Sequence, residues 1–259
     1  MSFAITTLLL AVGLFAAMLG FAQLGRWAGT AWLRRHRDGL AKGVGTAEAA
    51  VFGILGLIVA FTFSGAAQRF HDRRHLITEE ANAISTAYLR MDLLPDEVRA
   101  DLRDLFRRYT NVRAVVYRNV RDASATKAKL EEGSRLQAEI WSKALAACSK
   151  PGTHPQAAML LLPALNAMFD ISITRAMATV NHPPLVIFLL LGGLSLLGAL
   201  LVGYSISQNS DRTFFHTVLF SLVLALAIFV ILDLEYPRRG FIRLDAADQL
   251  LLDLSESMH

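Results

Sequence analysis

The stretch AEAAVFGILGLIVAFTFSG (residues 47–65) and the polar residues after it decide the fold of this chain. These nineteen residues carry one charge, Glu48, and are long enough to cross a bilayer as a helix. The following AAQRFHDRRHLITEEANAISTAYLRMDLL contains no Gly or Pro, so no residue type that ends a helix occurs before Pro95. One helix over residues 47–94 would be roughly 70 Å long. Such a helix suits a pore, a sensor stalk or a membrane-anchored scaffold better than a soluble enzyme.

The composition also predicts a membrane protein, since 54% of the 259 residues are hydrophobic and the mean hydropathy is +0.41. Four apolar segments of crossing length account for this: residues 3–24, 47–65, 185–206 and 214–232. The alternative for the first is a signal peptide cleaved after LGFA. That alternative is disfavoured because no Lys or Arg precedes the segment and because it is long for a signal peptide.

A hydrophilic insert, residues 68–182, separates the second and third crossings and reads as helices throughout. After Pro95, apolar positions recur every three or four residues and predict one buried stripe. That stripe is Val98, Leu102, Leu105, Tyr109, Val112 and Val116. Three further stripes are predicted: Phe70, Ile77, Ala81, Ile84, Tyr88 and Met91; Leu130, Gln137, Ile140, Trp141, Ala144 and Cys148; and Leu162, Leu165, Phe169, Ile173 and Val180. Four amphipathic helices with short turns predict an antiparallel bundle.

The predicted fold class is therefore all-α, with four transmembrane helices and a helical-bundle insert between the second and third. The second helix is long and continuous with the insert. Residues 1–67 hold crossings one and two, residues 68–182 the insert, residues 183–233 crossings three and four, and residues 234–259 a C-terminal tail with a short amphipathic helix. No Gly/Ser-rich linker sets the insert apart. The single cysteine, Cys148, excludes an intrachain disulfide.

Several stretches resemble a bacterial membrane-protein family labelled bestrophin-like: GLIVAFTFSGAAQRFHDRRHLITEEANAISTAYLRMDLLP, HPPLVIF at the start of the third crossing, the pair Gly203-Tyr204 and ILDLEYPRRGFIRLD near the end. Bestrophins are pentameric anion channels whose long second helix lines the pore and continues into a helical cytosolic region. The resemblance implies a homo-oligomer, by analogy a pentamer, that conducts small inorganic ions, most simply anions. It implies a multi-pass protein of a bacterial inner (plasma) membrane. The acidic calcium-binding cluster of bestrophins matches no run here.

One polar face of the long helix recurs every three or four residues: Ser64, Gln68, His71, His75, Glu79, Asn82 and Thr86. Continued back into the membrane segment, the same side carries Phe61 and Leu57. In a ring of subunits, Leu57 and Phe61 would form an apolar constriction and the seven polar residues would line a pore or vestibule. The alternative is that Leu57 and Phe61 meet lipid or other helices while the polar face meets bulk water.

Other chemistry finds little support in the sequence. His71, His75 and Glu79 share a face and could ligate zinc, but no fourth ligand is evident and two arginines adjoin them, so we interpret them as surface residues. No phosphate-binding glycine loop, nucleophile elbow, HExxH or paired-Cys spacing occurs, which argues against an enzyme. No cofactor is expected. The net charge of +4 is spread along helices and does not indicate nucleic acid.

The sidedness and the function each leave two alternatives. Basic residues of the first loop (Arg26, Arg34, Arg35, Arg37 and Lys42) favour a cytoplasmic loop, with the insert and both termini outside. The bestrophin layout implies the reverse. Asp233 and Glu235 are expected at the membrane interface, near Arg238 and Arg239. For function, the alternative to an ion channel is a non-conducting, membrane-anchored helical bundle for interaction or sensing.

Overall fold

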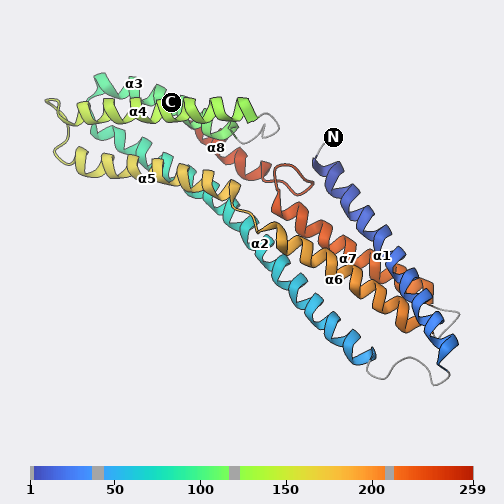
Figure 1. Cartoon of the computed structure of the whole chain (residues 1–259). Helices are drawn as coiled ribbons and strands as arrows, with labels where there is room; N and C mark the ends of the chain where they lie inside the picture. Colours follow the sequence, from blue (N-terminus) through green and yellow to red (C-terminus); the bar gives the residue numbers. More distant parts are fainter. Residues whose placement is uncertain (1–2, 37–43, 117–122, 208–212, 259) are drawn as a thin grey trace. The chain divides into compact units, whose positions relative to one another are not determined.

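The structure of the chain, a computed structural model, describes residues 3–36, 44–116, 123–207 and 213–258. Within these residues it is all-helical, as predicted (Figure 1). The elements are α1 (Phe3–Arg35), α2 (Val44–Arg90), the 3-10 turn η1 (Met91–Leu93), α3 (Asp96–Val115), α4 (Ala123–Cys148), α5 (Ala157–Val180), α6 (Leu185–Ile206), α7 (Thr213–Glu235) and α8 (Asp245–Ser257). The long second helix is confirmed, because α2 runs for 47 residues without a break.

Among the residues that the structure describes, four helical stretches are long and apolar enough to cross a membrane: Phe3–Arg35, Gly45–Leu93, Ala157–Ile206 and Phe215–Glu235. The third of these includes both α5 and α6. The predicted arrangement of four spans, with a helical insert between the second and the third, is thereby confirmed. The chain divides into two compact units, whose first boundary falls within α2 after Gln68.

The first unit, here called the membrane unit, comprises Met1–Gln68 and His182–Phe241. It contains α1, the first part of α2, α6 and α7, and α1 packs most extensively against α6 (Figure 1). Small residues allow this close approach. A Cβ added at Gly25 would lie 2.0 Å from the Leu200 carbonyl oxygen, and one at Gly203 would lie 1.8 Å from the Ala22 carbonyl oxygen. Small residues at such crossings are the usual way for membrane helices to pack.

The second unit, here called the bundle unit, comprises Arg69–Asn181 and Ile242–His259. It contains the second part of α2, α3, α4, α5 and α8 (Figure 1). Its core confirms most of the predicted stripe on α3, since Leu102, Leu105 and Tyr109 are buried there. Val112 and Val116 are buried as well, while Val98 is only partly buried. Between α4 and α5 the chain turns at Gly152, whose φ of 84° lies in the left-handed region that favours glycine.

Two features of the bundle unit differ from the prediction. The α8 helix is a fifth member of the core, where Leu244, Leu251 and Met258 are buried. The predicted face of α5 was wrong at Ile173 and Val180, which are exposed. The buried face instead comprises Leu161, Ala164, Leu165, Met168, Ser172 and Arg175. Because α5 is apolar on nearly every side, apolar spacing could not identify its inner face.

Candidate functional site

In the membrane unit, the predicted constriction residues lie on an open side of α2. Leu57 is 54% exposed and Phe61 is 68% exposed in the single chain. Ser64 and Gln68 are exposed as well. The opposite side of α2 is packed: Leu55, Thr62 and Ala66 are buried, and the Thr62 hydroxyl donates a hydrogen bond to the Ile58 carbonyl at 2.7 Å. An apolar side chain as large as Phe61 is therefore left available for a further molecule, lipid or water.

In the bundle unit, the predicted vestibule residues are likewise exposed: His71, His75, Glu79, Asn82 and Thr86. His75 Nδ1 lies 3.5 Å from a carboxylate oxygen of Glu79. In the part of the chain that the structure describes, no group of three His, Cys, Asp or Glu side chains is placed to hold a metal ion. This face therefore presents imidazole, amide, hydroxyl and carboxylate groups on one side of α2.

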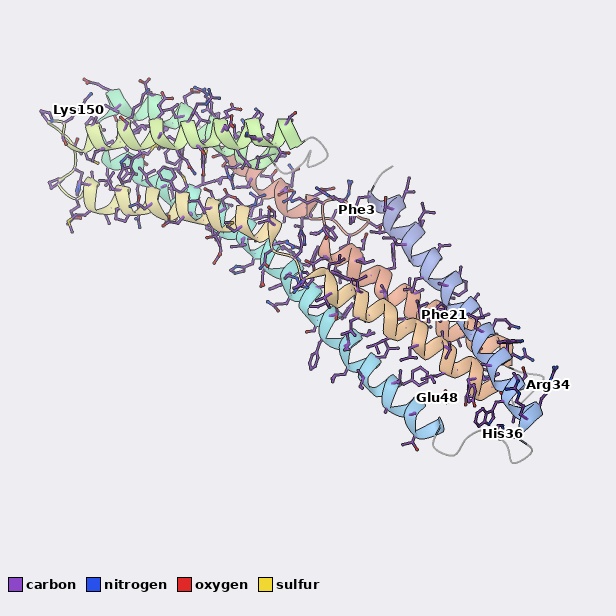
Figure 2. The ribbon with its side chains drawn as sticks, viewed as in Figure 1. Phe3, Phe21, Arg34, His36, Glu48 and Lys150 are labelled. Carbon is purple, nitrogen blue, oxygen red and sulfur yellow. The ribbon has the colours of Figure 1, made fainter. Side chains whose placement is uncertain are left out.

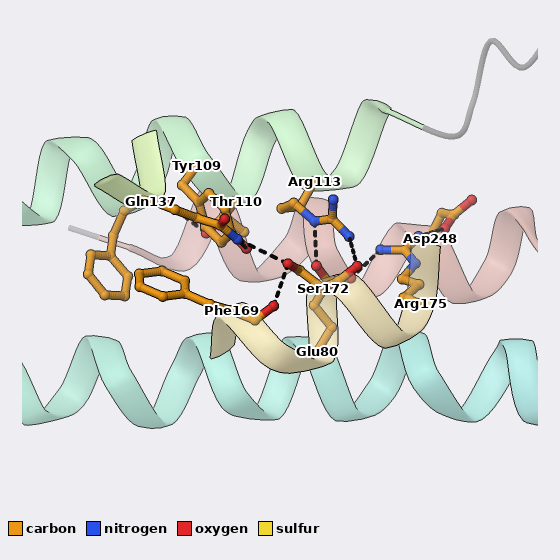
Figure 3. Close-up of polar contacts among 10 residues, drawn as sticks. Glu80, Tyr109, Thr110, Arg113, Gln137, Phe169, Ser172, Arg175 and Asp248 are labelled. Atoms are coloured by element: carbon orange, nitrogen blue, oxygen red, sulfur yellow. Dashed lines mark hydrogen bonds and ion pairs between the residues drawn. The ribbon is translucent and has the colours of Figure 1, made fainter. Parts of the chain in front are cut away.

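Glu80, the residue after the exposed Glu79, is fully buried and lies at the centre of a buried charge network (Figure 3). It pairs with Arg113 Nε of α3 and, at 2.5 Å, with Arg175 of α5. Arg175 also donates to Asp248 of α8 at 2.8 Å. All four side chains are at most 5% exposed. Their formal charges cancel, which offsets the large cost of moving ions out of water.

Neutral polar groups extend this network along the bundle core (Figure 3). The Gln137 amide donates to the Tyr109 hydroxyl at 3.1 Å and to the Ser172 hydroxyl at 3.0 Å. The Ser172 hydroxyl donates to the Phe169 carbonyl at 2.7 Å. Burial raises the pKa of Tyr109 above its ordinary value of about 10, with Glu80 adding to the rise and Arg113 opposing it. The network thus links α3, α4 and α5 through satisfied hydrogen bonds.

Two further arginines, Arg107 and Arg73, donate hydrogen bonds to backbone carbonyls at the C-terminal ends of α8 and α5. Arg107 of α3 donates from Nε and Nη2 to the Met258 carbonyl, at 3.1 and 2.8 Å, just after α8. Arg73 of α2 is buried and donates to the carbonyls of Ala178 and Asn181 at the C-terminal end of α5. Carbonyls at a helix C-terminus lack intrahelical partners and carry partial negative charge, so a guanidinium is a fitting partner.

At the end of α7, the two acidic residues expected at the membrane interface are buried within the protein. Asp233 accepts hydrogen bonds from the Phe241 N–H at 2.9 and 3.1 Å. A Cβ at position 240 would lie 2.0 Å from the same carboxylate, so Gly240 is required for this close turn. Glu235 lies 2.9 Å from His182 Nδ1, before α6. These contacts indicate a structural role in closing the membrane unit.

Comparison with known proteins agrees with this architecture. The model of the bestrophin-like domain family matches residues 9–248. The chain belongs to the bestrophin-like family. Two crystal structures of a bacterial bestrophin homolog from Klebsiella pneumoniae, each with one substitution, are similar to it, with TM-scores of 0.73 and 0.72 and sequence identities of 12% and 14%. Both matches cover 95% of this chain, and they cover 99% and 98% of the homolog.

At these identities the structural likeness establishes the shared fold alone. No curated protein matches the chain. Bestrophin-like proteins are generally non-enzymatic channel-type membrane proteins, and the several candidate spans of this chain agree with a membrane location.

The sequence contained a signal for the buried charge network that apolar spacing alone does not use. Glu80 follows Ile77 by three residues and precedes Ile84 by four, so it lies on the buried stripe of α2. Arg113 follows Tyr109 by four residues, again in phase with a buried position. A charged residue at a core position predicts an oppositely charged partner, because an unpaired buried charge is too costly. Which residue is the partner depends on the tertiary arrangement.

Proposed function

We propose that the chain forms a homo-oligomeric channel for small inorganic ions, most simply anions, in which α2 of each subunit lines the conduction path. The observation that carries the proposal is the exposure of all nine predicted residues on α2, while buried residues occupy other sides of the same helix in both units. Membership of the bestrophin-like family supports it, since bestrophins are anion channels.

In this proposal Leu57 and Phe61 form the narrow part of the path. Both are large, apolar and exposed in the single chain, and a ring of such side chains can gate conduction by excluding water. Ser64, Gln68, His71, His75, Glu79, Asn82 and Thr86 line the wider, polar part. A pentamer is the number of subunits favoured by the family, and the bacterial plasma membrane is the location it favours.

Ion flux into liposomes tests the proposal. The full chain is purified in mild detergent, its oligomeric mass is measured, and it is reconstituted with an anion-sensitive dye inside the vesicles. We expect flux above that of protein-free liposomes, and a several-fold rise for Phe61→Ala because the shorter side chain eases wetting of the constriction. Phe63→Ala is the matched control, since Phe63 is 46% exposed but lies about 200° around α2 from Phe61.

Flux equal to that of protein-free vesicles, for both the wild type and Phe61→Ala in a verified oligomer, would overturn the channel. A monomer or a simple dimer would also count against it. The sign of the selectivity is tested by Glu79→Gln, which removes a ring of negative charge and should shift the reversal potential toward that of the anion. Glu97→Gln on the exposed side of α3 should leave the reversal potential unchanged.

A non-conducting interaction module is the second candidate, and the outer face of α5 is the observation that favours it. Four large apolar side chains are exposed there: Met159, Ile173, Met177 and Val180. Exposed apolar patches of this kind often mark protein interaction sites. This candidate predicts a monomer or a simple dimer that gives no flux above that of protein-free liposomes.

A further inference from the structure

The outward side of α1 carries a shallow groove that is separate from α2. It has a volume of about 650 Å³ and is lined by Ala17, Gly20, Phe21, Gln23, Leu24 and Trp27. The packed side of α1 is different, since Met18, Ala22, Gly25 and Gly29 are buried. At Gly20 a Cβ would meet nothing within 4 Å, so the floor of the groove is open. Phe21, Leu24 and Trp27 form its apolar walls.

The groove has the height of one membrane leaflet. Ala17 and Trp27 are ten residues apart, which is a rise of about 15 Å, or about half of a hydrocarbon core of roughly 30 Å. Trp27, at the end of the groove nearest the C-terminus of α1, is 71% exposed. Tryptophan is enriched at the level of lipid headgroups. A hydrocarbon chain beside Phe21 and Leu24 would therefore lie deeper in the bilayer than Trp27.

Two arginines lie on the same side of α1 as the groove, closer to the C-terminal end of the helix. Arg34 follows Trp27 by seven residues and Arg35 follows Leu24 by eleven, so each lies within about 20° of a groove residue when viewed along the axis. Both are exposed. Figure 2 shows Phe21 midway along α1, and Arg34 and His36 at its end. Long guanidinium side chains at this level reach the phosphates of lipid headgroups.

We propose that this groove binds an anionic glycerophospholipid, with its phosphate at Arg34 and Arg35 and one acyl chain across Gly20. Charge favours an anionic lipid over a symmetric pairing of two chains through this face. Two copies that met through this face in a symmetric pair would bring four arginines together, which is unfavourable, whereas an anionic headgroup is complementary. The proposal does not depend on ion conduction.

Fluorescence of Trp27 tests the proposal in the full-length chain. The variant Trp32→Phe/Trp141→Phe leaves Trp27 as the single tryptophan. It is reconstituted in bilayers that contain phosphatidylglycerol or phosphatidylcholine brominated in mid-chain. From the quenching we expect a preference for phosphatidylglycerol of about fivefold or more, the contribution of roughly one arginine near an anionic surface.

Two substitutions in this background should abolish the preference. Arg34→Gln/Arg35→Gln removes the headgroup contact, and the control Arg108→Gln/Arg135→Gln removes the same charge from exposed positions of the bundle unit. Gly20→Leu fills the groove floor. Its control is Gly13→Leu, because a Cβ at Gly13 also meets nothing within 4 Å but lies outside the groove.

Three results would overturn the proposal. The first is equal quenching of Trp27 by the two lipids. The second is a preference that survives Arg34→Gln/Arg35→Gln. The third is protection of Trp27 from both lipids, which would mean that another copy of the chain covers the groove. Loss of the preference in both targeted variants, and its retention in both controls, supports the lipid site.

Discussion

The membrane unit and the bundle unit solve the same packing problem with different residues. Among the described residues, a few large apolar side chains of the membrane unit are less than 2% exposed, namely Met18, Leu191 and Ile231, whereas the bundle unit buries many more, such as Phe106, Tyr109 and Leu165. The membrane unit instead brings backbones together at Gly25 and Gly203. The buried ion network of Glu80, Arg113, Arg175 and Asp248 belongs to the bundle unit.

This difference follows from the two solvents. In water, burial of bulky apolar side chains is favourable by about 25 cal/mol per Å², so large residues stabilise the bundle unit. In a bilayer, lipid tails are as apolar as leucine, and helices associate through close contact between small residues. The two units should therefore respond differently to the same kind of substitution.

The largest effect on stability is expected at the buried ion network around Glu80 in the bundle unit. Glu80→Gln removes the carboxylate that Arg113 and Arg175 share and leaves two buried guanidinium groups to one buried carboxylate, Asp248, so it should lower the free energy of unfolding by about 3–5 kcal/mol. Denaturant unfolding followed by circular dichroism measures this. The adjacent Glu79→Gln is exposed and should change stability by no more than about 0.5 kcal/mol. Equal effects of the two substitutions would show that the network contributes nothing.

The apolar part of the bundle core is tested at Leu105. This residue is buried on α3, and Leu105→Ala should destabilise by roughly 2–5 kcal/mol through lost transfer energy and the cavity that remains. Leu89→Ala is the matched control, because Leu89 is largely exposed. An unchanged thermal midpoint for Leu105→Ala would contradict the bundle.

In the membrane unit, adding a single methyl group should be harmful. Gly203→Ala places a Cβ against the Ala22 carbonyl, so α1 and α6 must move apart, at a cost of roughly 1–3 kcal/mol. Gly192→Ala, on the same helix, meets nothing within 4 Å and should be neutral or slightly stabilising. Thermal unfolding in mild detergent compares the two. If Gly203→Ala matched Gly192→Ala, close contact would not be what holds α1 to α6.

The smallest expected effect is a pH dependence of the bundle unit. In the unfolded chain, the Tyr109 hydroxyl ionises at its ordinary pKa of about 10. In the folded protein, burial raises the pKa of Tyr109, so the hydroxyl keeps its proton to higher pH. Stability is therefore lost as the pH rises from about 10 through the folded pKa. In that window, wild type should lose up to about 1.4 kcal/mol per pH unit more than Tyr109→Phe. Below pH 9 the two stability curves should run parallel, and parallel curves above pH 10 would contradict the assignment.

Much of the fold could be predicted from local pattern. Apolar runs of crossing length predicted four spans, and the absence of Gly and Pro after residue 65 until Pro95 predicted one long α2. The spacing of Leu102, Leu105 and Tyr109 predicted the inner face of α3. The nine candidate residues on α2 were predicted to share a side, and all are exposed. That they line a pore stays a prediction.

By itself, the sequence determined which segments are helical, which are apolar enough for a membrane and where most amphipathic faces lie, because these properties depend on residues within a few turns of one another. Only the tertiary structure decided the partners of Glu80, which come from helices far apart in the chain, and the place of α8 in the bundle core. It also decided that Gly203 meets Ala22 and that Asp233 caps a turn at Phe241. The physical reason is that a buried charge or a bare backbone requires a partner, while the choice of that partner is made by three-dimensional packing and not by sequence spacing.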